Sequence, residues 1–115
     1  MSKIRQKRVA DQLQSQLMDL LRTELRDPRL SLVTVTAVDI DRELQYADVF
    51  ISKLGEETDR NAVLHAFEGA KGFLRHELAH RLRLKTVPDL RFHWDVSIEH
   101  GERISQLIDS LEENE

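Results

Sequence analysis

The chain has 115 residues, of which 40% are hydrophobic and 33% charged, so it can build one modest core and is expected to form a single domain. It has no cysteine, which excludes disulfides and thiolate metal sites, and no apolar run long enough for a signal peptide or a membrane span, so we expect a soluble, cytoplasmic protein. The net charge of -4 argues against a general polyanion binder.

The first predicted element is a long helix over residues 4–26. Its apolar residues recur at steps of three and four, which places them on one face of a helix. Asp27-Pro28 ends this helix, because the residue before a proline avoids the helical region. The apolar face consists of Val9, Leu13, Leu17, Leu20, Leu21 and Leu25.

Two strands follow and predict a β-hairpin. Residues 32–40 are alternating and rich in β-branched side chains, and residues 46–52 have a similar character. The polar residues 41–44 connect them. We expect Asp39 and Asp41 to have turn roles rather than catalytic ones, because aspartate side chains bond readily to nearby backbone in turns.

The next segment predicts two helices with an interruption between them. Thr58 or Asp59 is expected to cap a helix over residues 60–70. Two glycines then fall within residues 69–72, and each costs about 1 kcal/mol in a helix interior relative to alanine. We therefore expect a break or sharp kink here, followed by a second helix over residues 73–84.

The last part of the chain predicts a strand and a helix. Residues 90–98 alternate between apolar and polar side chains, with Arg91 and His93 on the polar face, where a cross-strand contact is expected for His93. Helical spacing returns over residues 104–111. Three strands with helices on one side predict an α+β two-layer sandwich, formed by one domain over residues 1–111 and followed by a short acidic tail.

Charged residues are unevenly distributed along the chain. Residues 1–10 hold four basic and no acidic side chains, and residues 71–91 hold six basic and two acidic ones. Residues 99–115 hold six acids and one arginine. This distribution is compatible with a nucleic-acid surface, and equally with solvated helix faces. An aromatic content of 5% disfavours recognition of single strands by base stacking, and Phe50, Phe92 and Trp94 are expected in or near the core.

The stretch HELAH matches the H-E-x-x-H pattern of helical zinc proteases. Its spacing turns His76 and His80 to the same side of a helix, but a zinc protease needs a third ligand. The positions that metzincins give to Gly and His hold Arg83 and Thr86. The two histidines also lie opposite a leucine face, so we expect them to face solvent. A zinc-dependent hydrolase that uses this pair and Glu77 is one alternative function, and a protein–protein adaptor is another.

Three long segments together resemble the ribosome-binding factor A family, and the resemblance extends from about Arg5 to Leu111. The segments are RVADQLQSQLMDLLRTELRDPRL, VTVTAVDIDRELQYADVFIS and AKGFLRHELAHRLRLKTVPDLRFHWDVSIEHGERI. The chain departs from the family pattern at Val96, where a polar residue is usual, and in carrying the histidine pair. The resemblance implies a type II KH-like fold with a helix-kink-helix at residues 70–72. There the kink Ala70-Lys71-Gly72 joins two nearly continuous helices and takes the place of the G-x-x-G loop that clamps nucleic acid in other KH domains.

The resemblance also implies a function. Members of the family are non-catalytic assembly factors that bind the small (30S) ribosomal subunit during late maturation of its ribosomal RNA (16S rRNA processing), and they are linked to cold adaptation. No cofactor and no metal are implied, and we expect a monomer when the protein is free. The residues expected to contact RNA are Arg5, Lys7, Arg8, Ala70, Lys71, Gly72, Arg75, Arg81, Arg83 and Lys85.

Overall fold

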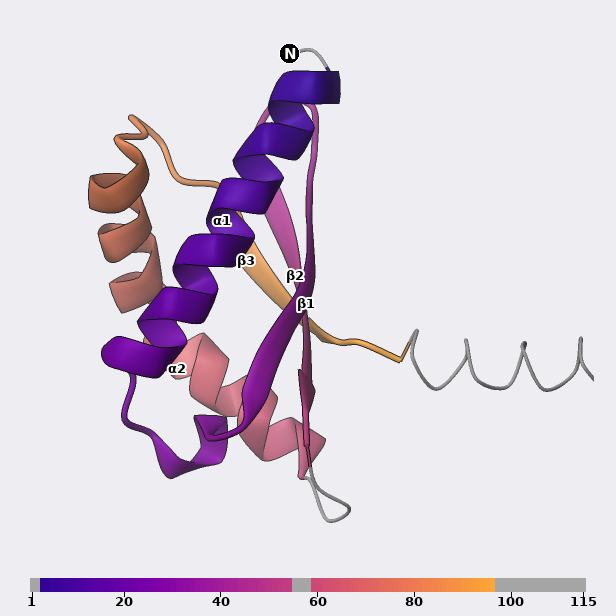
Figure 1. The fold of residues 1–115 in the computed structure, drawn as a ribbon, viewed down its shortest axis with the longest axis vertical. Coiled ribbons are helices and arrows are strands. Elements are labelled where there is room, and N and C mark those ends of the chain that lie inside the picture. Colours follow the sequence, from indigo (N-terminus) through magenta and orange to yellow (C-terminus); the bar gives the residue numbers. More distant parts are fainter. Residues whose placement is uncertain (1–2, 55–58, 97–115) are drawn as a thin grey trace, which may run out of the picture.

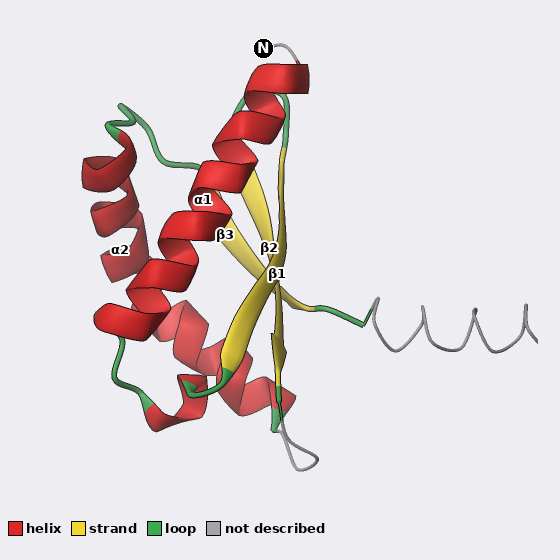
Figure 2. Cartoon of the chain, viewed as in Figure 1, coloured by secondary structure: helices red, strands yellow, loops and turns green. Residues whose placement is uncertain are grey.

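The computed structural model describes residues 3–54 and 59–96. The predicted helix over residues 104–111, the end of the predicted last strand and the acidic tail lie outside the described residues, as does Thr58. The described elements, shown in Figures 1 and 2, are α1 (Lys3–Thr23), a 3-10 turn η1 (Pro28–Leu30), β1 (Val33–Ile40), β2 (Tyr46–Lys53), α2 (Arg60–Leu82) and β3 (Asp89–Trp94).

The strands form one mixed sheet in the order β1-β2-β3. β1 and β2 are antiparallel neighbours, as the predicted hairpin requires, whereas β2 and β3 are parallel. A parallel pair needs a long crossover connection, and α2 provides it. Both helices lie on the same side of the sheet (Figure 1). The predicted α+β fold is therefore confirmed, in the element order of a KH-like domain.

Helix α1 supplies much of the core. Leu13, Leu17 and Leu20 are at most 1% exposed, and burying a leucine side chain stabilises the fold by roughly 1.5–3 kcal/mol. The helix ends at Thr23 rather than at the predicted residue 26. The reason is local, because the backbone N–H of Leu25 bonds to the carbonyl of Leu20, five residues back, at 3.1 Å and so closes the last turn early.

The β1–β2 pair contains a turn and a bulge. In the turn, the Asp41 carboxylate accepts a hydrogen bond from the Tyr46 backbone N–H at 2.9 Å, which confirms the predicted turn role of Asp41. The register shifts between Val35 and Ala37, which leaves Thr36 as the extra residue of a β-bulge. The Thr36 hydroxyl bonds to the carboxylate of Asp95, just beyond β3, so the bulge is tied to the far strand.

The free edge of β1 is covered by side chains of α1. The Gln6 side chain donates to the Ile40 carbonyl, and Gln14 Nε2 donates to the Val35 carbonyl at 3.1 Å. The Val35 N–H in turn lies 3.0 Å from Met18 Sδ. Unpaired edge groups invite pairing with another chain. These contacts from α1 therefore protect the β1 edge.

Helix α2 is continuous from Arg60 to Leu82, so of the two predicted alternatives the break is wrong and the kink is confirmed. Asp59 caps its start by accepting a hydrogen bond from the Ala62 N–H at 3.1 Å, and Arg83 caps its end in the left-handed region at φ 52°. Figure 1 shows the helix changing direction between its two halves. The glycines do not break the helix, because apolar residues buried on both sides of them, such as Phe67 and Leu74, anchor both halves in the core.

Aromatic side chains lie in the core and at its border. Phe92 is buried and stacks on Phe67 with ring centroids 4.8 Å apart. Phe50 and Trp94 are half-buried, and the Arg60 guanidinium lies 5.1 Å from the Trp94 ring centroid. The positions of Phe92 and Trp94 confirm the expectation that they lie in or near the core. For Phe50 the expectation is wrong, because alternation along β2 turns it to the opposite face of the sheet, where its ring centroid lies 5.3 Å from that of His93.

Candidate nucleic-acid interface

The histidine pair of the H-E-x-x-H stretch faces solvent, as predicted. His76 and His80 are exposed, with ring centroids 4.7 Å apart, whereas Leu74 and Leu78 on the other face of α2 are fully buried. Within residues 3–54 and 59–96, no group of three His, Cys, Asp or Glu side chains is placed to hold a metal ion. Glu77 lies 4.0 Å from Arg81, as an ordinary helix-surface pair does.

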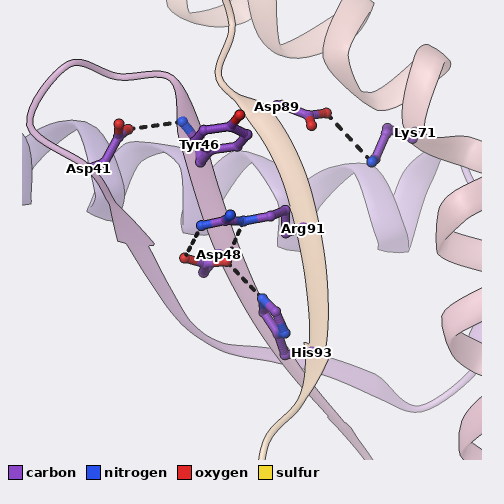
Figure 3. Close-up of polar contacts among 7 residues, drawn as sticks. All are labelled: Asp41, Tyr46, Asp48, Lys71, Asp89, Arg91 and His93. Atoms are coloured by element: carbon purple, nitrogen blue, oxygen red, sulfur yellow. Dashed lines mark hydrogen bonds and ion pairs between the residues drawn. The ribbon is translucent and has the colours of Figure 1, made fainter.

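Lys71 is engaged in two ion pairs. Its Nζ lies 3.4 Å from a Glu68 carboxylate oxygen and 3.5 Å from an Asp89 carboxylate oxygen, and its side chain is only 26% exposed. Figure 3 shows the Lys71–Asp89 contact between α2 and the start of β3. Lys71 therefore fastens the crossover helix to the strand that follows it.

Arg81 joins the two helices. Its Nη1 donates to Asp19 Oδ2 at 2.6 Å and to Gln16 Oε1 at 3.1 Å, both on α1. This hydrogen bond from Arg81 lowers the pKa of the Asp19 carboxyl. The side chain of Arg81 is 25% exposed. Its predicted role as an RNA contact therefore competes with an observed role in helix packing.

Arg75, Arg83 and Lys85 lie around the C-terminal end of α2. Arg75 is half-buried and donates from Nη2 to the Val87 carbonyl at 3.0 Å, while its Nε is buried without an acceptor among the described residues. Arg83 and Lys85 are exposed. These side chains form a positive rim beside the connection from α2 to β3.

The basic side chains at the start of α1 point in different directions. Lys7 and Arg8 are exposed and line a shallow hollow along α1, and Lys7 lies 3.7 Å from Asp11. Arg5 lines a different cleft, together with Arg75 and Lys85. The fold therefore brings together three predicted contact residues that are up to 80 positions apart in the sequence.

The Ala70–Gly72 segment lies inside α2. Ala70 is half-buried and lines a small hollow with Arg26 and Arg29 near the end of α1. Gly72 is exposed, and a Cβ built on it meets no atom within 4 Å. No close contact within the described residues therefore requires a glycine here, and the open space is available to a partner.

A charged network on the open face of the sheet was not predicted. Arg91 donates to both carboxylate oxygens of Asp48 at 2.9 and 3.0 Å, and His93 Nε2 lies 2.7 Å from the same carboxylate (Figure 3). The hydrogen bond from Arg91 lowers the pKa of Asp48, and the Arg91 guanidinium lies 4.4 Å from the Tyr46 ring centroid. The alternation of residues 90–98 did place Arg91 and His93 on the polar face, and their contact with Asp48 confirms the cross-strand expectation for His93.

A model of the family described as "Ribosome-binding factor A" matches residues 5–108. The chain belongs to the ribosome-binding factor A family. Ribosome-binding factor A of Nitrosospira multiformis is 48% identical over 102 residues, which cover 89% of this chain and 81% of that protein.

Solved structures of the family have the same fold. The crystal structure of ribosome-binding factor A from Thermus thermophilus matches with a TM-score of 0.70 and 29% identity, over 77% of this chain and 93% of that one. A homology model of the Thermus thermophilus factor, fitted into a cryo-EM map of a 30S–RbfA complex, matches with a TM-score of 0.57 and 34% identity, over 74% and 93% of the two chains. Among the described residues of our chain, no helix has the length and apolar character needed to cross a membrane.

Proposed function

We propose that this chain binds the small (30S) ribosomal subunit in the cytoplasm and assists late maturation of its ribosomal RNA, including 16S rRNA processing, as a non-catalytic RNA-binding protein. The observation that carries the proposal is family membership over residues 5–108. It is supported by the fold shared with the factor fitted into the 30S–RbfA map.

The surface chemistry at one end of the molecule supports binding to RNA. Arg5, Arg75 and Lys85 line one cleft, and Arg83 is exposed at the end of α2. Cationic side chains bind RNA through its phosphates and release counterions, so the affinity depends on salt and little on base sequence. Such contacts suit a factor that docks on folded RNA. The net charge of -4 is no obstacle, because the local distribution of charge matters more for binding than the sum, and basic side chains outnumber acidic ones in this cleft.

The predicted contact residues divide into two groups by their observed surroundings. We assign direct contacts to the accessible side chains and to the exposed glycine. Lys71 and Arg81 hold α2 against β3 and α1, and we assign them a supporting role. The complete proposed set is Arg5, Lys7, Arg8, Ala70, Lys71, Gly72, Arg75, Arg81, Arg83 and Lys85.

The maturation role is tested in cells that lack the protein. We expect them to accumulate precursor 16S rRNA, most clearly at low growth temperature, and we expect the wild-type chain to restore mature ends. The lengths of the 16S rRNA ends measure this directly. An Arg83→Gln/Lys85→Gln variant should complement less well than wild type at equal protein level. Normal 16S ends in cells without the protein would refute the maturation role while leaving binding to be tested separately.

A further inference from the structure

A cleft at one end of the molecule is lined by both cationic and apolar side chains. It lies between the start of α1, the β1–β2 turn, the second half of α2 and the connection to β3, and its volume is about 730 Å³. Leu44, Leu84 and Val87 contribute apolar surface to it. A cleft of this size lies in the range of roughly 300–1,000 Å³ that binding sites for small organic groups occupy.

The charge of this cleft is positive. Arg5, Arg75 and Lys85 line it, against the acids Glu43 and Asp89. Asp89 is already paired with Lys71 at 3.5 Å, so its charge is compensated from outside the cleft lining. The lining therefore holds three cationic and two anionic side chains, and this excess of positive charge favours an anion.

The side chain of Arg75, which lines this cleft, is held in a fixed position. Its Nη2 donates to the Val87 carbonyl at 3.0 Å, which orients the guanidinium plane. Its Nε is buried without an acceptor among residues 3–54 and 59–96. The guanidinium is thus anchored by its bond to Val87 in a residue that lines the cleft.

We propose that this cleft, formed by Arg5, Arg75 and Lys85, is the seat for a phosphodiester of the ribosomal RNA backbone. This inference rests on the proposed function and specifies where the RNA is held. Arg75 acts as the anchored donor, and Arg5 from α1 and Lys85 from the connection between α2 and β3 add positive charge. The apolar side chains of the cleft accommodate the adjoining ribose or base. The planar, multiply donating guanidinium suits phosphate better than a point charge does.

The test compares two double variants that remove equal charge. Arg75→Gln/Lys85→Gln alters the cleft. Arg22→Gln/Lys53→Gln alters the ends of α1 and β2 at the other end of the molecule (Figure 1), where both side chains make only exposed contacts. Binding to purified 30S subunits is measured by sedimentation over a series of salt concentrations. Thermal unfolding followed by circular dichroism checks that each variant is folded.

The expected effect follows from counterion release. Each phosphate contact contributes about 0.7–0.9 to the slope of log binding constant against log salt, so losing one contact weakens binding roughly five- to eightfold at about 0.1 M salt. The cleft variant should therefore lose roughly 25- to 60-fold and show a slope reduced by about 1.4–1.8, and the control variant should change less than about threefold. Arg75→Lys should bind more tightly than Arg75→Gln but less tightly than wild type, because lysine keeps the positive charge and lacks the planar guanidinium group.

The outcomes distinguish failure of the cleft assignment from failure of the proposed function. If the cleft variant binds 30S subunits like the control variant, the cleft is not the phosphate seat, although the proposed function stands. If wild-type protein does not bind 30S subunits, the proposed function itself fails. If Arg75→Gln prevents folding, the Arg5→Gln/Lys85→Gln variant replaces it, because both side chains are exposed, and the same loss is expected. Binding of a labelled poly-glutamate peptide in preference to a single-stranded oligouridylate would overturn the assignment in favour of an acidic protein partner.

Discussion

Replacing either glycine of α2 by alanine should stabilise the fold. Gly69 and Gly72 lie inside the continuous helix, and a Cβ at either position meets no atom within 4 Å. Alanine is therefore accepted without a clash, and the difference in helix propensity should raise the free energy of unfolding by about 0.8–1.0 kcal/mol per substitution. For a domain of this size, that corresponds to a rise in Tm of roughly 4 °C.

Urea unfolding followed by circular dichroism measures this change, with the slope m checked for constancy. Gln12→Ala is the matched control, because Gln12 is exposed within α1 and makes no packing contact in the core. Its effect should stay within about 0.5 kcal/mol. Destabilisation by Gly72→Ala would refute the reasoning and show that the bend of α2 needs glycine conformations. A more stable Gly72→Ala protein that binds 30S subunits more weakly would show that the glycine serves the partner rather than the fold.

Further predictions concern the core, the sheet edge, the acid range and the histidine pair. Leu74→Ala, at a side chain with 0% exposure, should cost about 2–5 kcal/mol in urea unfolding, against less than about 0.5 kcal/mol for Leu32→Ala, which is 66% exposed. Gln14→Ala, which frees the Val35 carbonyl at the β1 edge, should cost about 1 kcal/mol and increase aggregation measured by light scattering; unchanged stability would contradict the edge role. The hydrogen bond from Arg29 lowers the pKa of Asp27 from 3.8 to about 2, so the unfolded chain binds more protons between these values and stability should fall as pH drops from about 4 to 2. The urea midpoint of Asp27→Asn should therefore change less over this pH range than that of wild type. The His76→Ala/His80→Ala variant should keep both its stability, within about 0.5 kcal/mol, and its binding to 30S subunits; loss of binding would give the pair a role that its solvent exposure does not suggest.

The elements that the sequence predicted well depend on local periodicity. The apolar steps of α1 and the alternation around Arg91 and His93 each repeat within a few residues, and the structure confirms both. Asp41 and Asp59 were identified as a turn residue and a candidate cap by short-range chemistry, and both bond to backbone within five positions. Local patterns of this kind do not need knowledge of the rest of the fold.

The features that the sequence did not predict depend on how distant segments meet. Arg81 lies 62 positions from Asp19, and the Arg91 contact with Asp48 depends on the register of a parallel strand pair. The two glycines alone could not decide between a break and a kink in α2. The helix continues through them because a propensity cost of about 1 kcal/mol per glycine is smaller than the stabilisation from burying apolar residues on both sides. The candidate site is affected in the same way. Composition located the basic segments, but only the fold separates Arg75, in the cleft, from Lys71 and Arg81, which are held in ion pairs.

Co-sedimentation of the purified protein with separated ribosomal subunits tests the central claim most directly. The protein should move with the 30S subunit and not with the 50S subunit. Binding should weaken by at least tenfold when salt rises from about 50 to about 200 mM, because several phosphate contacts are lost together. If the protein stays at the top of the gradient at both salt concentrations, or binds both subunits equally, the chain does not act as a specific binding factor for the small subunit.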